Sequence, residues 1–156
     1  MTETTQTWSA RLAELGIELP EVAAPVAAYV PAVRSGDHVY TSGQLPFVDG
    51  KLSLTGKLGA DASDADAKAA ARVCALNALA AINALVGIDN LVRVVKVVGF
   101  VASAQGFTGQ PGVINGASEF LVEVFGDAGI HARSAVGVAE LPLGSAVEVE
   151  LIVEVR

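Results

Sequence analysis

Arg133 is the residue whose type and setting best suit chemistry. It lies in an otherwise uncharged stretch from Ile130 to Ala139, at the start of a predicted strand. A guanidinium held by a strand can bind a carboxylate through two parallel hydrogen bonds. The same side chain could instead reach water at the edge of a sheet, or pair with Glu148 across a hairpin. The spacing of the residues leaves these interpretations open.

The other residues that often carry chemistry are two histidines and one cysteine. His38 and His131 lie far apart without a carboxylate or second histidine at metal-ligand spacing, so we expect no metal site. His38 follows a turn and is expected to be solvated, whereas His131, close to Arg133, could lie near a pocket. Cys74 falls on the apolar stripe of a predicted helix, which favours a buried, unreactive thiol. The sequence contains no phosphate-binding glycine motif and no serine-hydrolase motif.

The composition favours one small domain that associates with copies of itself. Of 156 residues, 52% are hydrophobic and 17% are charged, which is an apolar balance for a small monomer. The net charge of −7 repels phosphate backbones, so we expect no nucleic-acid partner. No uncharged apolar stretch reaches about 18 residues, the length needed to span a membrane, and residues 1–11 lack an apolar signal core. We therefore expect a cytoplasmic oligomer without a membrane partner.

Periodicity and capping residues predict the secondary structure. The predicted helices cover residues 5–15, 63–86 and 110–125. The predicted strands cover residues 26–34, 38–44, 51–54, 91–102, 132–140 and 146–155, with a turn at 35–37. The long helix carries an apolar stripe of Ala67, Ala71, Cys74, Ala78, Ile82 and Leu85. The 91–102 strand is apolar on both faces, as in a strand covered on both sides, whereas the last strand alternates between apolar and mostly acidic residues.

This order of elements predicts an α/β sandwich built on a mixed sheet. Residues 1–25 would form an N-terminal helix and linker, and residues 26–156 a single domain. The two main helices can cover only one face of the sheet, and the other face carries valines. Burial of that second face would require another copy of the chain.

Two stretches of the chain carry a recognisable signature. The first is GDHVYTSGQLP, from Gly36 to Pro46. The second comprises Ala132-Arg133-Ser134, Leu141-Pro142 and the VEVE run from Val147 to Glu150, with shorter matches at Val94-Val95-Lys96 and Ile114-Asn115. Together these residues resemble the Rid family, known as RidA/YjgF and formerly as endoribonuclease L-PSP. The resemblance runs from about Val26 to Val155.

The resemblance implies a chorismate-mutase-like α/β sandwich that forms a homotrimer, with a barrel-like centre and ligand pockets between subunits. Members of the family studied as deaminases hydrolyse reactive 2-imino or 2-enamino acids, such as 2-aminoacrylate, to 2-keto acids and ammonia without a cofactor. By resemblance, Arg133 would hold the substrate carboxylate, and Glu148 would position or activate the attacking water. The other residues implied in substrate binding are Tyr29, Ser42, Gly43, Asn115 and Ala135.

The chain also departs from the family pattern. Ala135 stands where the well-studied deaminases have a cysteine, and His131 replaces a usual proline or small residue. The 103–112 loop is longer than in compact members, and the N-terminal helix is an addition to the basic fold. Ala135 and the altered loop favour an alternative function, a non-enzymatic or regulatory trimer that binds a small carboxylate metabolite. The older family name implies a further alternative, an endoribonuclease, which the acidic charge disfavours.

Overall fold

The computed structural model describes residues 5–22 and 27–156. Its helices are α1 (Trp8–Glu14), α2 (Asp64–Val86) and α3 (Gln110–Phe125), with 3₁₀ turns η1 (Ile88–Asn90), η2 (Gly126–Gly129) and η3 (Pro142–Gly144). Its strands are β1 (Ala32–Ser35), β2 (His38–Thr41), β3 (Phe47–Val48), β4 (Lys51–Leu52), β5 (Leu91–Ala102), β6 (Ala132–Val138) and β7 (Val147–Val155). All three predicted helices are therefore present.

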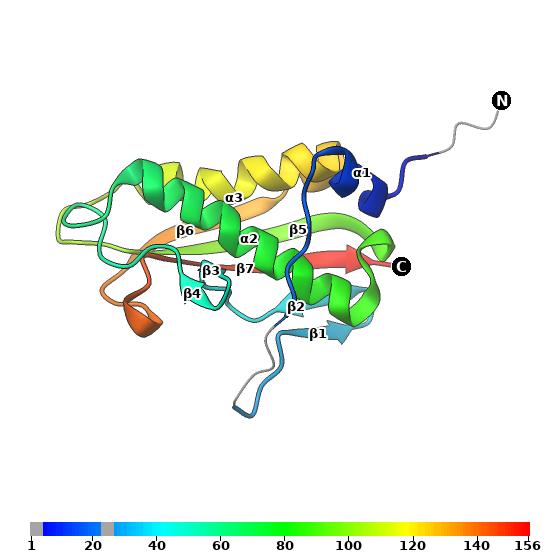
Figure 1. Ribbon diagram of the computed structural model, residues 1–156, viewed down its shortest axis with the longest axis horizontal. Helices are drawn as coiled ribbons and strands as arrows, with labels where there is room; N and C mark the ends of the chain where they lie inside the picture. Colours follow the sequence, from blue (N-terminus) through cyan, green and yellow to red (C-terminus); the bar gives the residue numbers. More distant parts are fainter. Residues whose placement is uncertain (1–4, 23–26) are drawn as a thin grey trace.

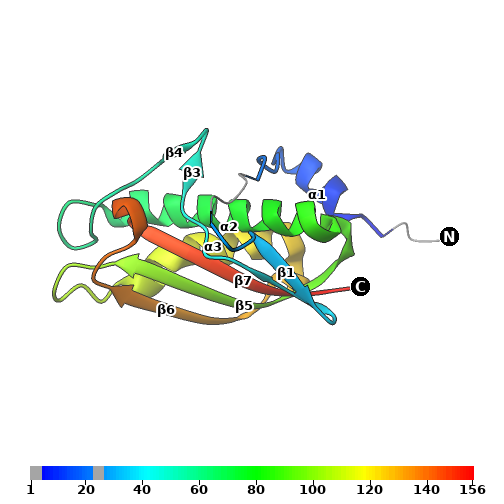
Figure 2. The same cartoon turned by 90° about the horizontal axis from the view of Figure 1, so that it is seen from below.

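Five strands form one mixed sheet in the order β1-β2-β7-β5-β6. β5 and β6 run parallel, and the other neighbouring strands run antiparallel. α2 and α3 lie beside each other on one face of this sheet, and no described element covers the opposite face (Figure 1, Figure 2). The predicted α/β architecture with two main helices on one face is confirmed.

The alternation along β7 separates the two faces of the sheet. Its buried residues are Val147, Val149, Leu151, Val153 and Val155. The residues between them point to the uncovered face and are only partly buried. β5 behaves in the same way, since Val97 is buried under the helices while Val98 and Phe100 are partly exposed. The sequence predicted that β5 is covered on both sides, but within one chain it is covered on one.

The uncovered face combines apolar and acidic side chains. Tyr40 and Val136 are 46% and 44% exposed there, beside the partly exposed Phe100 and Ile152. The acidic residues of this face are Glu148, Glu150 and Glu154 of β7. The predicted apolar second face is therefore present, although aromatic and acidic residues join its valines.

α2 and α3 pack closely because small residues line their contact. The Ser63 hydroxyl accepts a hydrogen bond from the Asp66 amide (3.1 Å), so α2 begins where its capping residue predicts. A Cβ at Gly116 would collide with the Lys68 carbonyl, so only glycine lets α3 approach the α2 backbone here. The predicted stripe is buried except at its end, where Leu85, in the last turn of α2, is 45% exposed.

α2 is also long and apolar enough to cross a membrane by length and composition alone. Half of its most apolar window is nevertheless buried inside the fold, as is usual for a core helix. Its buried side chains face α3 and the sheet. These contacts identify α2 as the central helix of the hydrophobic core.

The segments before α2 differ most from the sequence prediction. The strand predicted from Val26 begins only at Ala32, and residues 23–26, which include the predicted domain boundary, lie outside the described residues. The turn is shorter than predicted, since Ser35 still pairs with His38. Further on, β3 and β4 form a hairpin instead of one strand at 51–54. Its Asp49-Gly50 turn has positive φ at both residues (50° and 78°), which suits a tight two-residue hairpin.

α1 is attached to the end of the domain by side-chain contacts. The Trp8 indole Nε1 donates to the Leu91 carbonyl (2.7 Å), and its ring meets Phe125 edge to face, with centroids 5.0 Å apart. The Ser9 amide and hydroxyl both donate to the Asp89 carboxylate (2.8 and 2.7 Å). These hydrogen bonds lower the pKa of Asp89. Trp8 thus connects the N-terminal helix to both β5 and α3.

Replacing Trp8 with alanine should lower the free energy of unfolding by about 2–4 kcal/mol, because a partly buried aromatic ring and its hydrogen bond are lost. Trp8→Phe is the matched control, since it retains a ring against Phe125 and loses only the indole hydrogen bond, at a cost of about 1 kcal/mol. Urea unfolding of both variants measures the difference. Equal stability of Trp8→Ala and the unmodified protein would show that α1 is only loosely attached.

Candidate functional site

Arg133 lies on β6, at the edge of the sheet, and reaches toward α3. Its Nη1 donates hydrogen bonds to Asn115 Oδ1 (2.8 Å) and Ser118 Oγ (3.3 Å). Asn115 and Ser118 are three residues apart on α3, so they share one face of the helix. We call Arg133, Asn115 and Ser118 the arginine half-site. The structure therefore brings together Arg133 and Asn115, two of the residues that the family resemblance implies in substrate binding.

The Arg133 guanidinium keeps one edge free. A guanidinium has five N–H donors, and here those of Nη1 are directed at α3. Among the described residues, none accepts a hydrogen bond from Nε or Nη2, and no carboxylate forms an ion pair with Arg133. An edge formed by Nε and Nη2 presents two parallel donors, which is the arrangement that binds a carboxylate.

His131 lies directly behind the arginine half-site. Its Nε2 is 2.8 Å from Ser118 Oγ, and its Nδ1 is 2.6 Å from the Gly129 carbonyl oxygen. Burial lowers the pKa of His131, and the charge of Arg133 lowers it further, against the opposing effect of the Gly129 hydrogen bond. The sequence considered His131 only as a neighbour of a pocket and did not single out Ser118. The three-residue spacing between Asn115 and Ser118 is the signal that could have found it.

The second group of predicted site residues, Ser42 and Gly43, lies just after β2, where the regular pairing of β2 with β7 ends. Thr41 uses its hydroxyl to accept a backbone N–H of β7 (3.0 Å). Gln44 and Val149 then exchange two backbone hydrogen bonds (2.8 and 3.0 Å), which returns the chain to β7. Ser42 and Gly43, between these two anchors, are displaced from the ladder. The TSGQ run, residues 41–44, therefore forms a local irregularity in the pairing with β7.

Glu148 lies directly against Gly43. The Glu148 carboxylate occupies the space that a Cβ at position 43 would fill, so a larger residue there would displace the Glu148 side chain. The Ser42 hydroxyl donates to the Val30 carbonyl (2.7 Å), and this hydrogen bond connects residues 42–43 to the segment that carries Tyr29. Tyr29 itself is 60% exposed. We call Ser42, Gly43 and Glu148 the glutamate half-site.

The Glu148 carboxyl group is perturbed by its surroundings. Burial raises its pKa, and the charge of Glu150 raises it further. Among the described residues, no cation forms an ion pair with Glu148. A carboxyl group with a raised pKa and no cationic partner is suited to accept and return a proton.

The two half-sites lie on opposite faces of the sheet. Arg133 pairs with Val97, which pairs with Leu151, and both apolar residues are buried under the helices. Glu148 instead pairs with Phe100 on the uncovered face. Directly opposed residues on neighbouring strands share a face, so Arg133 and Glu148 point away from each other. The predicted alternative of a hairpin pair between them is wrong, because β5 lies between β6 and β7.

The remaining predicted residues occupy varied positions. Ala135 pairs with Gly99 and packs against the core on the same face as Arg133. It belongs to an edge strand, whose outer backbone groups have no partner strand in the described part of the chain. His38 is partly exposed at the start of β2. Cys74 is buried, as predicted, and burial raises the pKa of its thiol.

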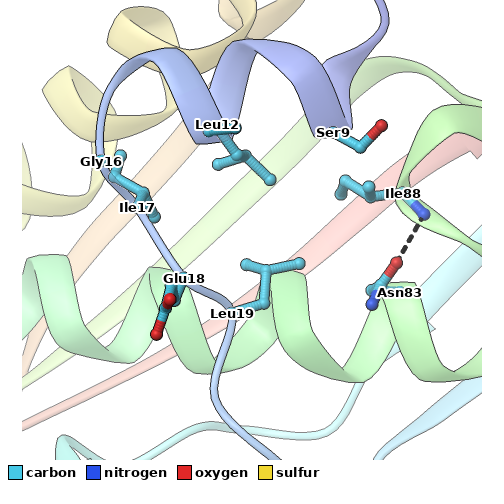
Figure 3. Close-up of a pocket in the computed structure, with 9 residues that line it drawn as sticks. Ser9, Leu12, Gly16, Ile17, Glu18, Leu19, Asn83 and Ile88 are labelled. Atoms are coloured by element: carbon cyan, nitrogen blue, oxygen red, sulfur yellow. Dashed lines mark hydrogen bonds between the residues drawn. The ribbon is translucent and has the colours of Figure 1, made fainter.

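Two cavities of the single chain lie away from both half-sites. A cavity of about 600 Å³ lies between α1, the chain that follows it and the last turns of α2 (Figure 3). It is lined by Ser9, Leu12, Ala13, Gly16, Ile17, Glu18, Leu19, Asn83 and Ile88. A second cavity of about 350 Å³ includes Lys57, Asp61 and Glu140. Neither contains a predicted site residue, and the described residues include no cluster of three or more metal-ligating side chains.

Comparison with known proteins gives consistent matches along the chain. The family described as "YjgF/chorismate_mutase-like, putative endoribonuclease" matches residues 9–155. Protein TCP17 of Trypanosoma cruzi is 48% identical over 150 residues, which cover 95% of this chain and 94% of that protein. A solved structure of a protein of unknown function from Agrobacterium tumefaciens is 45% identical, with a TM-score of 0.88, over 96% of this chain and 92% of that one. TdcF of E. coli, solved with bound serine, is 26% identical with a TM-score of 0.62, over 87% of this chain and 94% of that one.

The raised pKa of Glu148 predicts a pH-dependent cost to stability. The folded protein binds the Glu148 proton more tightly than the unfolded chain, so this residue makes folding less favourable as pH rises through its raised pKa. Glu148→Gln cannot ionise and should be more stable than the unmodified protein at neutral pH. The gain should disappear as the pH falls below about 3, where Glu148 is protonated in both the folded and the unfolded chain.

Thermal unfolding at a series of pH values measures this difference. Glu154→Gln, on the same face of β7, is the matched control and should show a smaller gain. A Glu148→Gln variant that is less stable at neutral pH would mean that the carboxylate has a stabilising partner.

Proposed function

The chain belongs to the YjgF/chorismate-mutase-like family, and from this premise we propose that it is a Rid-type deaminase of reactive 2-imino and 2-enamino acids. The reaction adds water to the C=N bond and yields a 2-keto acid and ammonia. It requires a cation for the substrate carboxylate and a group that transfers the protons of water. The free edge of the Arg133 guanidinium is the observation that carries the proposal.

Arg133 would fix the position of the substrate. An imine carbon is already electrophilic, so catalysis depends mainly on orientation and on a polarised water molecule. Asn115 and Ser118 hold one side of the guanidinium, which leaves its other edge for the carboxylate. The E. coli relative TdcF, solved with serine, supports a ligand that carries a carboxylate and a nitrogen on neighbouring carbons.

Glu148 would transfer protons between water and the substrate nitrogen. In the first step the ionised carboxylate accepts a proton from water while the oxygen bonds to the imine carbon, and it then returns this proton to the nitrogen. In the second step it accepts the hydroxyl proton of the carbinolamine and returns it to the nitrogen, so that ammonia leaves as the C–N bond breaks and the C=O bond forms. The raised pKa of Glu148 suits a group that must both accept and return a proton.

A homotrimer would unite the two half-sites. Arg133 and Glu148 point to opposite faces of one chain, so a small ligand that contacts both must lie between chains. The uncovered face, with Tyr40 and Val136 strongly exposed, provides an apolar surface for such assembly. We propose that each pocket combines the arginine half-site of one subunit with the glutamate half-site of another. We place the trimer in the cytoplasm, as the sequence predicts.

A second candidate function is the binding of a small carboxylate metabolite without turnover. It is favoured by Ala135, which stands where the deaminases that the sequence resembles have a cysteine. The same guanidinium edge would serve this regulatory function. The endoribonuclease named in the family description is disfavoured, because a net charge of −7 opposes binding of a phosphate backbone.

Arg133→Ala should abolish measurable acceleration of 2-iminopropionate hydrolysis and weaken pyruvate binding about tenfold or more, because charge-assisted hydrogen bonds are lost. Arg133→Lys should recover little, since an ammonium cannot present two parallel donors. Glu148→Gln should lower turnover more than it lowers pyruvate affinity. Release of pyruvate and ammonia from imine generated in situ, together with calorimetric titration of pyruvate, measures these effects.

Arg34→Ala is the matched control, because Arg34 is an exposed arginine of β1 whose Nε donates a hydrogen bond to the Gly36 carbonyl. It should retain both activity and affinity. Pyruvate binding without any turnover in the unmodified protein would favour the regulatory function. Unchanged pyruvate affinity in Arg133→Ala would refute the proposed carboxylate site.

The assembly is tested by placing a charge on the uncovered face. The unmodified protein should have a mass in solution of about three times 15.9 kDa. Val136→Glu should shift this mass toward that of the monomer, because a buried unpaired carboxylate opposes association. Val122→Glu, at a residue of α3 that is 41% exposed, is the control and should remain trimeric. A monomer of the unmodified protein in light scattering at micromolar concentration would contradict the shared pocket.

A further inference from the structure

A continuous series of hydrogen bonds lies behind Arg133. Arg133 Nη1 contacts Ser118 Oγ (3.3 Å), Ser118 Oγ contacts His131 Nε2 (2.8 Å), and His131 Nδ1 contacts the Gly129 carbonyl (2.6 Å). The series begins at the guanidinium and ends on the backbone of η2. It lies on the side of Arg133 opposite the free edge.

The chemistry of these groups gives the series a direction. A carbonyl oxygen can only accept, so Nδ1 of His131 carries the proton that is donated to Gly129. In the neutral ring Nε2 is then an acceptor, and it receives the hydroxyl proton of Ser118. The Ser118 oxygen is left with its lone pairs toward Arg133, which donates to it. Every donor in the series therefore has an acceptor when His131 is neutral.

The surroundings of His131 favour that neutral form. The ring is half-buried, and burial is the main cause of its lowered pKa; the Gly129 hydrogen bond opposes this shift, and the positive charge of Arg133 adds to it. A protonated ring would instead donate from Nε2 to Ser118, so the Ser118 hydroxyl proton would lose its acceptor in the series and a second positive charge would lie near Arg133. The geometry of the series and the electrostatics therefore favour the same arrangement.

We propose that His131 is a positioning residue for Arg133: neutral His131 orients the Ser118 hydroxyl, which in turn holds the guanidinium with its Nε–Nη2 edge toward the ligand. The orientation of the guanidinium is a property of the free protein. Its consequence for carboxylate binding rests on the function proposed above. His131 itself does not touch the ligand and acts only through Ser118.

Two conservative variants separate the contacts of His131. His131→Gln can retain an acceptor near the position of Nε2, facing Ser118, while His131→Asn retains only a donor near the position of Nδ1, facing Gly129. ¹⁵N relaxation of the Arg133 Nε–H group in the ligand-free protein measures how well the guanidinium is ordered. We expect it to be well ordered in the unmodified protein and in His131→Gln, and measurably less ordered in His131→Asn and Ser118→Ala, where the Asn115 hydrogen bond remains.

His38→Asn is the matched control, because it removes the other histidine from a strand outside the arginine half-site. It should leave the Arg133 signal unchanged. The ¹⁵N shifts of the His131 ring in the unmodified protein should also show a protonated Nδ1 and a bare Nε2. A protonated Nε2, or a guanidinium as well ordered in both Ser118→Ala and His131→Asn as in the unmodified protein, would overturn the proposal whatever the ligand.

Pyruvate affinity tests the functional consequence. Ser118→Ala and His131→Asn should each bind pyruvate roughly three- to tenfold more weakly, as for loss of one neutral hydrogen bond, and His131→Gln should restore most of the affinity. The double variant Ser118→Ala/His131→Asn should lose no more pyruvate affinity than the single variant with the larger loss. Both substitutions act on Arg133 through the same series of hydrogen bonds, so their effects should not add. Fully additive losses would overturn the proposal. Failure of the unmodified protein to bind any 2-keto acid would refute the proposed function, whereas the relaxation result would still decide the role of His131.

Discussion

The alternation of side chains along β7 determines which residues of the sheet face the helices and which face the uncovered side. Successive residues of a strand point to opposite faces, so the valines and Leu151 that pack under α2 and α3 force Glu148 onto the uncovered face. The paired strand β5 extends the same division, and β6 follows β5 in register. Arg133 is thereby carried to the helix side of the sheet edge, where α3 supplies its partners. One alternating pattern therefore produces both the core and the separation of the two half-sites.

The half-sites contain charged groups that no opposite charge of the described residues compensates within one chain. Glu148 is partly buried without a cationic partner among the described residues, and Arg133 uses only one of its terminal nitrogens. Burial of a charge is unfavourable unless another group compensates for it. Gly43 supports this arrangement, because its missing side chain is what gives the carboxylate its space. Such uncompensated groups are typical of sites that acquire their partner when a ligand or a second subunit binds.

Local patterns were sufficient to predict much of this fold. Ser63 marks the start of α2, and the alternation in β7 appears in the structure residue for residue. The prediction was less successful for features that depend on contacts between distant segments of the chain. Leu85 occupies the correct helix face but is exposed, because burial depends on which elements lie above that turn. The β3–β4 hairpin was missed because strands of two residues are too short for an alternating pattern to be recognised.

The sequence by itself determined the residue types of the candidate site, since the TSGQ run and the Ala-Arg-Ser run are local signatures of a known family. It also determined that a second apolar face exists, because that follows from alternation alone. Only the tertiary structure decided that Arg133 and Glu148 point to opposite faces, since this depends on β5 being inserted between β6 and β7. Only the tertiary structure placed Ser118 and His131 behind Arg133. The physical reason is that strand order and helix docking arise from contacts between distant segments, which spacing along the chain does not encode.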